Sequence, residues 1–88
     1  MLTYTYVPEM TERRQPHRAA HLARLESARD EGLLLLAGAF ADPVDGALLL
    51  FEAEDAGQIL AWVAGDPYNQ AGLIRSAEVR EINVAVRR

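Results

Sequence analysis

The stretch "GLLLLAGAFADPVDGALLLFEA", Gly32–Ala53, determines the fold that the sequence predicts. Two apolar runs, Leu33–Phe40 and Ala47–Ala53, flank a turn that contains Pro43 and closes in Asp45-Gly46. Apolar runs joined by a short turn with proline, aspartate and glycine are typical of a β-hairpin. The stretch therefore predicts two antiparallel strands in the middle of the chain.

On either side of this hairpin the sequence predicts a helix. The first begins near Pro16, which suits a first helical turn because its missing N–H would be unpaired there anyway, and it ends at Gly32. The second covers Glu54–Ala64 and stops at Gly65, and a short turn of helix follows over Pro67–Ala71. Both long segments carry apolar residues at helical spacing, namely Ala19, Leu22, Leu25 and Ala28, then Ala56, Ile59, Leu60 and Val63.

Two further strands are expected at the ends of the chain. Leu2–Val7 is rich in β-branched and aromatic residues, and the polar segment Glu9–Gln15 is expected to loop into the first helix. Leu73–Val86 is expected to form one long strand with a bulge near Arg80 or Glu81, because its apolar residues change parity there. The resulting order, β-α-β-β-α-β in a single domain over the whole chain, is the ferredoxin-like α+β arrangement.

This arrangement leaves one face of the sheet uncovered, because two helices cover only the other. The two hairpin strands are nearly continuous in apolar residues, whereas a strand with one wet face normally alternates. The uncovered face therefore needs a partner, and a second copy of the sheet is the simplest one. We expect a homodimer with its sheets face to face; the alternative is that the leucine runs tolerate exposure.

Composition excludes several classes of function. The chain has a formal charge of −4 and scatters its nine basic residues, all arginines, so no nucleic-acid partner is expected. No apolar run approaches the roughly 20 residues that cross a bilayer, and the N-terminus lacks a basic region followed by an apolar one. We expect no membrane association and a cytoplasmic location. The sequence also lacks glycine-rich phosphate motifs and serine-hydrolase motifs, so no cofactor is expected.

The two histidines, His17 and His21, lie four residues apart on one face of the first helix. A zinc site needs three or four ligands, and no pattern in the sequence identifies a carboxylate as the third or fourth ligand beside the two histidines. No metal is therefore expected. His17 is expected to face solvent in the first turn. His21 lies at the edge of the apolar stripe, where two interpretations stay open: a buried residue bonded to a backbone carbonyl, or a group that reaches a cleft.

Asp66, in "GDPYNQAG" (Gly65–Gly72), also has two interpretations. Aspartate is a preferred N-cap residue, and proline is common at the helical position that follows it, so Asp66 is expected to cap a short helix. One carboxylate oxygen can cap while the other accepts from an imidazole, and such a pair would make the histidine a proton carrier. Tyr68 follows two residues later, where its ring could line a pocket or simply pack.

Three other positions are candidates for a ligand site. Tyr4 and Tyr6 project from one face of the first strand and are expected to border a cavity or the dimer seam. Gly38 interrupts an apolar strand, which usually marks a bulge or a close approach of backbone or ligand. We therefore take Tyr68, Gly38 and Tyr6 as candidate substrate-binding residues.

Four blocks of the sequence together resemble the YCII-related, or YciI-like, proteins. They are "AHLARL" (Ala20–Leu25), "GLLLLAGAF" (Gly32–Phe40), "DG" (Asp45-Gly46) and "GDPYNQAGL" (Gly65–Leu73), and the resemblance runs over almost the whole chain. It implies a ferredoxin-like fold that dimerises as an α/β barrel, and an active site on His21 and Asp66. Some relatives are associated with elimination chemistry on small chlorinated aromatic compounds. Many relatives end the second strand in Gly-Pro where this chain has Gly38-Ala39, which puts an inherited ligand preference in doubt.

Three functions follow from this pattern. The first is a small-molecule enzyme in which His21 is general base or acid, Asp66 orients it, and Tyr68 borders an unknown substrate in lyase or elimination-type proton transfer. The second is a non-catalytic module that binds a metabolite or a partner protein, since fold alone does not separate the two. The third is a scaffold in which the pair only fastens a helix to a loop. We rank the enzyme first.

Overall fold

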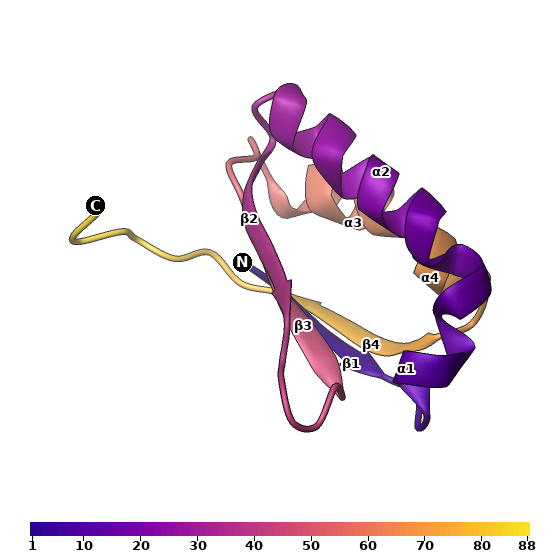
Figure 1. Cartoon of the computed structure of the whole chain (residues 1–88). Coiled ribbons are helices and arrows are strands. Elements are labelled where there is room, and N and C mark those ends of the chain that lie inside the picture. The colour runs from indigo at the N-terminus through magenta and orange to yellow at the C-terminus, as the bar shows by residue number, and fades with distance from the viewer.

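Four antiparallel strands form one sheet in the order β2-β3-β1-β4 (Figure 1). The computed structural model describes residues 1–88. The strands are β1 (Leu2–Tyr6), β2 (Leu34–Ala39), β3 (Gly46–Phe51) and β4 (Ile74–Val79). The hairpin β2-β3 predicted from the central stretch is confirmed, and β1 lies between β3 and β4.

The helices all lie on one face of this sheet (Figure 1). They are α1 (Met10–Arg13), the 3-10 turn η1 (Gln15–His17), α2 (Arg18–Asp30), α3 (Ala56–Ala64) and α4 (Pro67–Gln70). The predicted β-α-β-β-α-β order is confirmed, with α4 where the short helix was expected. The loop predicted over Glu9–Gln15 is wrong because α1 forms there, and the buried Met10 anchors it to the core.

The hairpin differs in detail from its prediction. The positive φ of its turn falls on Asp42 (φ 52°), not on Asp45-Gly46. Gly46 is instead the first residue of β3, and a Cβ there would collide with the backbone carbonyl oxygen of Tyr4. The bulge of β2 lies at Leu35, where the register to β3 shifts, so Gly38 does not mark a bulge.

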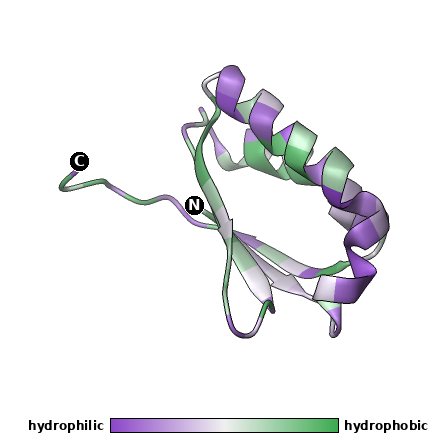
Figure 2. Ribbon diagram, viewed as in Figure 1, coloured by the Kyte–Doolittle hydropathy of each residue, from purple (hydrophilic) through white to green (hydrophobic).

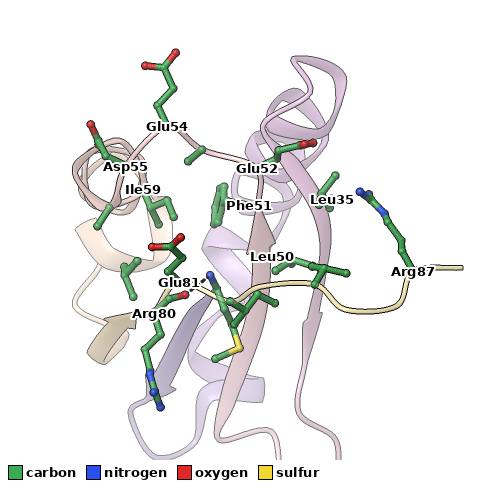
Figure 3. Close-up of a pocket in the computed structure, with 16 residues that line it drawn as sticks. Leu35, Leu50, Phe51, Glu52, Glu54, Asp55, Ile59, Arg80, Glu81 and Arg87 are labelled. Atoms are coloured by element: carbon green, nitrogen blue, oxygen red, sulfur yellow. Dashed lines mark hydrogen bonds between the residues drawn. The ribbon is translucent and has the colours of Figure 1, made fainter.

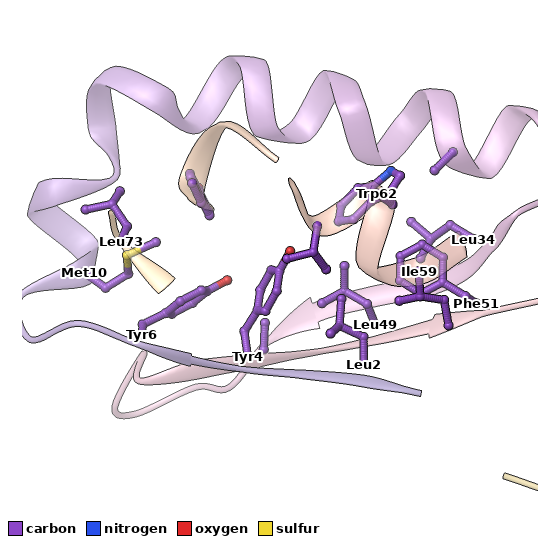
Figure 4. Close-up of a cluster of buried hydrophobic side chains, with 14 residues drawn as sticks. Leu2, Tyr4, Tyr6, Met10, Leu34, Leu49, Phe51, Ile59, Trp62 and Leu73 are labelled. Carbon is purple, nitrogen blue, oxygen red and sulfur yellow. The ribbon is translucent and has the colours of Figure 1, made fainter. Parts of the chain in front are cut away.

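The core lies between the sheet and the helices. Leu2, Tyr4 and Tyr6 alternate along β1 and all point toward the helical layer (Figure 4). This period of two is what a strand with one covered face requires. The cluster holds 14 buried apolar residues. Trp62 of α3 belongs to it and meets Phe51 edge to face at 5.2 Å.

The final strand is shorter than predicted. β4 ends at Val79, opposite Leu2, and the last ladder bond runs from the Arg80 N–H to the Met1 carbonyl. No neighbouring strand pairs with Glu81–Val86, so it forms no strand despite its alternating apolar residues. The predicted bulge near Arg80 is wrong for the same reason; β4 shifts register opposite the Thr5/Tyr6 step.

The opposite face of the sheet carries no helix (Figure 1). The strand register places Leu36, Leu48 and Leu50 on this face, together with Thr3 and Thr5. Leu36 is 52% exposed. In Figure 2 hydrophobic residues mark β2, and the segment after β4 alternates between hydrophobic and hydrophilic. No helix in the structure has the length and apolar character that crossing a membrane would require.

Candidate active site

Asp66 is the most deeply buried polar residue of the chain, with none of its surface exposed. It is the N-cap of α4, and its Oδ1 accepts a hydrogen bond of 3.0 Å from the Tyr68 backbone N–H. Pro67 follows at the first helical position, where its fixed φ suits a helix start. The predicted cap is therefore present, and it holds a carboxylate inside the fold.

His21 supplies the second group. It lies on the inner face of α2 and is 6% exposed. Its Nδ1 lies 2.7 Å from Asp66 Oδ1, 45 residues away along the chain. The alternative in which His21 forms a hydrogen bond to a backbone carbonyl is wrong, because its Nδ1 is bonded to the Asp66 carboxylate instead. The structure thus brings together the two residues that the sequence analysis singled out, and one carboxylate both caps α4 and holds the imidazole.

Tyr4 is a third member that the sequence analysis did not connect to the pair. Its hydroxyl donates a hydrogen bond of 2.8 Å to Asp66 Oδ2. Burial, and then the negative charge of Asp66 and this hydrogen bond, raise the pKa of the Tyr4 phenol well above its ordinary value. The phenol therefore stays protonated and remains a donor. The shared face of Tyr4 and Tyr6 was visible in the sequence, but their distance from Asp66 was not.

These contacts define which nitrogen of His21 carries the proton. An ionised carboxylate only accepts, so Asp66 receives hydrogen bonds from Tyr4, from the Tyr68 N–H and from His21 Nδ1–H. In the neutral ring Nε2 is then the unprotonated nitrogen. Nε2 makes no hydrogen bond within the chain and is not among the buried nitrogens without a partner. Its lone pair is accordingly open to the cavity that His21 lines.

That cavity, of about 230 Å³, lies between α2 and the sheet. All three predicted substrate-binding residues, Tyr68, Gly38 and Tyr6, line it with His21. The Tyr68 ring stacks on the imidazole, with centroids 3.7 Å apart and planes 11° apart. Tyr6 meets Tyr68 edge-on at 6.1 Å. Gly38 pairs with Leu48, so a Cβ added there would point to the helix-free face, where it would have no atom within 4 Å; Gly38 thus borders the cavity through its backbone.

Two arginines at the cavity were missed by the sequence analysis. Arg14 and Arg18 line it from the segment that enters α2. Arg18 and His21 are three residues apart on one face of α2, but Arg14 lies before that helix, so no pattern in the sequence joins it to His21.

The largest cavity of the chain, about 380 Å³, lies elsewhere (Figure 3). It is bounded by Leu35 and Leu50 of the sheet, Ile59 of α3 and the segment after β4, including Arg80 and Arg87. It contains no histidine, and its carboxylates form no cluster suited to a metal ion. Paired, buried titratable groups next to a concave space define a candidate active site better than size does. We therefore place the candidate site at His21.

Fold and site together define a class: a small α+β domain whose first long helix and Asp-Pro turn meet in a buried histidine-aspartate pair. Residues 1–83 match the model of the YCII-related domain, and the chain belongs to this family. It is 37% identical over 78 residues to Protein YciI of Escherichia coli O6:H1 (strain CFT073), covering 78% of this chain and 80% of that protein. Protein YciI of Shigella flexneri gives the same values.

A solved structure is also similar. It is 5-chloro-2-hydroxyhydroquinone dehydrochlorinase (TftG) from Burkholderia phenoliruptrix AC1100, in complex with 2,5-dihydroxybenzoquinone. The TM-score is 0.78 and the identity 26%, over 94% of each chain. The expected membership of the YCII-related family is thus confirmed, and the α+β fold is shared with a protein that carries out an elimination.

Proposed function

We propose that this protein is a small-molecule enzyme that uses His21 and Asp66 for proton transfer without a cofactor, in elimination-type chemistry. The observation that carries the proposal is the 2.7 Å bond between His21 Nδ1 and the buried Asp66 Oδ1, with Nε2 open to a cavity. The likeness to a dehydrochlorinase supports the reaction class. Tyr68, Tyr6 and Gly38 border the substrate in this proposal.

The chemistry follows from the roles of the two groups. Asp66 fixes the ring orientation and stabilises the imidazolium that forms when Nε2 accepts a proton. In a loss of HCl, Nε2 takes a proton from the substrate and the electrons of that bond move into the substrate. The C–Cl bond then breaks and chloride leaves with its electron pair. The imidazolium returns its proton to solvent, so that atoms and charge balance.

The first test is release of chloride from 5-chloro-2-hydroxyhydroquinone by the wild type and by His21→Gln. A positioned general base contributes about 10² to 10⁴ in rate, and we expect a loss of that size in His21→Gln. His17→Gln is the matched control, because His17 ends η1 just before α2 and does not line the cavity. The control is expected to turn over like the wild type.

Two results would count against catalysis by His21. Unchanged turnover in His21→Gln would remove the residue from the mechanism. Binding of 2,5-dihydroxybenzoquinone without turnover of the chlorinated substrate would favour the alternative, a non-catalytic metabolite-binding module.

We further propose a homodimer in which two sheets pack face to face through the surface that the helices leave open. Leu36, Leu48 and Leu50 on this face support the proposal, because a contiguous apolar patch in water is costly. Size-exclusion chromatography with light scattering should give twice the chain mass of 9.7 kDa. Leu36→Glu should give monomers.

Leu60→Glu is the control for this dimer test, since Leu60 is 50% exposed, much as Leu36 is, but lies on α3. A monomeric wild type, or a Leu36→Glu variant that stays dimeric, would contradict the face-to-face arrangement.

A further inference from the structure

Two guanidinium groups border the His21 cavity without an acidic partner. Arg14 and Arg18 both line it, and the only ion pairs of the chain are His21–Asp66 and Arg29–Asp30. No aspartate or glutamate lines this cavity. Two positive charges beside one partly closed space repel each other, and an anion bound between them would replace that repulsion with attraction.

The Arg14 side chain has no hydrogen-bond acceptor within the chain. Its Nε is buried and has no hydrogen-bond partner in the chain; Arg24 Nε, which does not line this cavity, is the other such atom. Buried N–H groups are nearly always paired, because leaving one unpaired costs free energy. Arg14 is half-buried at the end of α1, so its guanidinium is held near the cavity rather than free in solvent. This Nε is out of reach of the cavity, so a ligand oxygen would instead meet the terminal Nη atoms of Arg14, which form no hydrogen bond within the chain and are not buried.

The rest of the lining restricts the body of the ligand. Leu22 and Leu25 form the α2 wall, and Ala37 and Ala39 form the β2 wall. These two walls are therefore aliphatic, and the side chains on the β2 side are small. A pocket with apolar walls and a few convergent polar groups selects an apolar body with one polar end.

We propose that Arg14 and Arg18 form an anion-binding subsite, so that the substrates of the His21 cavity are small cyclic acids bound as phenolates or enolates. The guanidinium groups hold the ionised ring oxygen, and the ring lies between the aliphatic walls within reach of His21 Nε2. The inference rests on the proposed function only in taking this cavity as the substrate site. Recognition of the anion itself does not require turnover.

The positive charges of the two arginines also act on the pKa values of the tyrosines that line the cavity. Burial raises the pKa values of Tyr6 and Tyr68, while the positive charges of Arg14 and Arg18 act in the opposite direction on both phenols. The same field would act on a substrate hydroxyl in the cavity and favour its ionised form. Guanidinium groups are also suited to oxygen anions because they offer several N–H donors in a fixed plane.

The test compares two ring compounds by isothermal titration calorimetry of the full chain. The anionic probe is 2,5-dihydroxybenzoquinone, whose acidic hydroxyls ionise at neutral pH, and the uncharged probe is hydroquinone. The variants are Arg14→Gln and Arg18→Gln. Arg29→Gln is the control, because Arg29 is exposed at the far end of α2 and does not line the cavity.

We expect each of the two variants to weaken binding of the anionic probe about tenfold or more, as loss of a charge-assisted hydrogen bond does. Arg29→Gln should bind like the wild type, and hydroquinone should bind more weakly than the anion to the wild type. Arg18→Gln decides the result if Arg14→Gln does not fold, since Arg18 has no buried unpaired atom.

Three results would overturn the anion subsite: no binding of the anionic probe to the wild type, equal binding of hydroquinone, or wild-type affinity in Arg18→Gln. Failure of the proposed function looks different. Arginine-dependent binding in a protein without turnover would refute catalysis and leave the subsite standing. A His21-dependent turnover with arginine-independent binding would refute the subsite alone.

Discussion

Replacing Tyr4 by phenylalanine removes one oxygen atom from the network around Asp66. The Tyr4 side chain is 1% exposed, and its hydroxyl is the only donor to Asp66 Oδ2, at 2.8 Å. Tyr4→Phe would leave one oxygen of a fully buried carboxylate without a partner. A hydrogen bond to a charged group contributes about 1.5 to 3 kcal/mol, so we expect the free energy of unfolding to fall by about 2 kcal/mol.

Tyr6→Phe is the matched control for this change. Tyr6 lies two residues along the same strand, on the same face and also buried, but its hydroxyl forms no hydrogen bond within the chain. Its replacement should change the free energy of unfolding by less than about 0.5 kcal/mol. Urea denaturation at equal protein concentration measures both variants, because the stability of any oligomer depends on that concentration. Equal stability of Tyr4→Phe and Tyr6→Phe would refute the network.

Two further predictions concern the tyrosines and the glycines. Burial raises the pKa values of Tyr4, Tyr6 and Tyr68 above their ordinary value of 10.0, so the unfolded chain loses these protons first as the pH rises. Stability should therefore be complete below pH 10 and fall above it, by about 1.4 kcal/mol per pH unit for each phenol that stays protonated in the fold. Denaturation followed at several alkaline pH values checks this, and a flat stability would contradict it. Gly46→Ala should lower the melting temperature, because its Cβ would collide with the Tyr4 carbonyl oxygen. Gly38→Ala should lower it less, since its Cβ would have no atom of the same chain within 4 Å. Equal thermal unfolding of the two variants would contradict this difference.

Much of the fold could be predicted because it rests on local patterns. The hairpin is encoded in two apolar runs and a turn, and His21 and Asp66 each occupy a position with a recognisable local role, a helix stripe and a helix cap. What local patterns lack is the partner across the chain. The bond from Tyr4 to Asp66 joins residues 62 positions apart, and nothing near either residue predicts it.

The errors have the same physical origin. Glu81–Val86 alternates like a strand, but a strand also needs a neighbour, and no strand of the chain pairs with this segment. α1 was missed because four residues give too short a pattern, although Met10 is buried there. Arg14 and Arg18 were recognisable only once the cavity showed that they share it with His21.

We expect Asp66 to accept the Nδ1 proton of His21 and to leave Nε2 as a base open to the cavity. Long-range ¹H–¹⁵N NMR of the histidine rings measures this directly, with His17 as an internal reference in the same protein. For the neutral His21 ring we predict a proton on Nδ1 and an unprotonated Nε2. A proton on Nε2 in that neutral ring would contradict it, because the nitrogen facing the cavity would then be a donor that cannot accept a proton from a substrate.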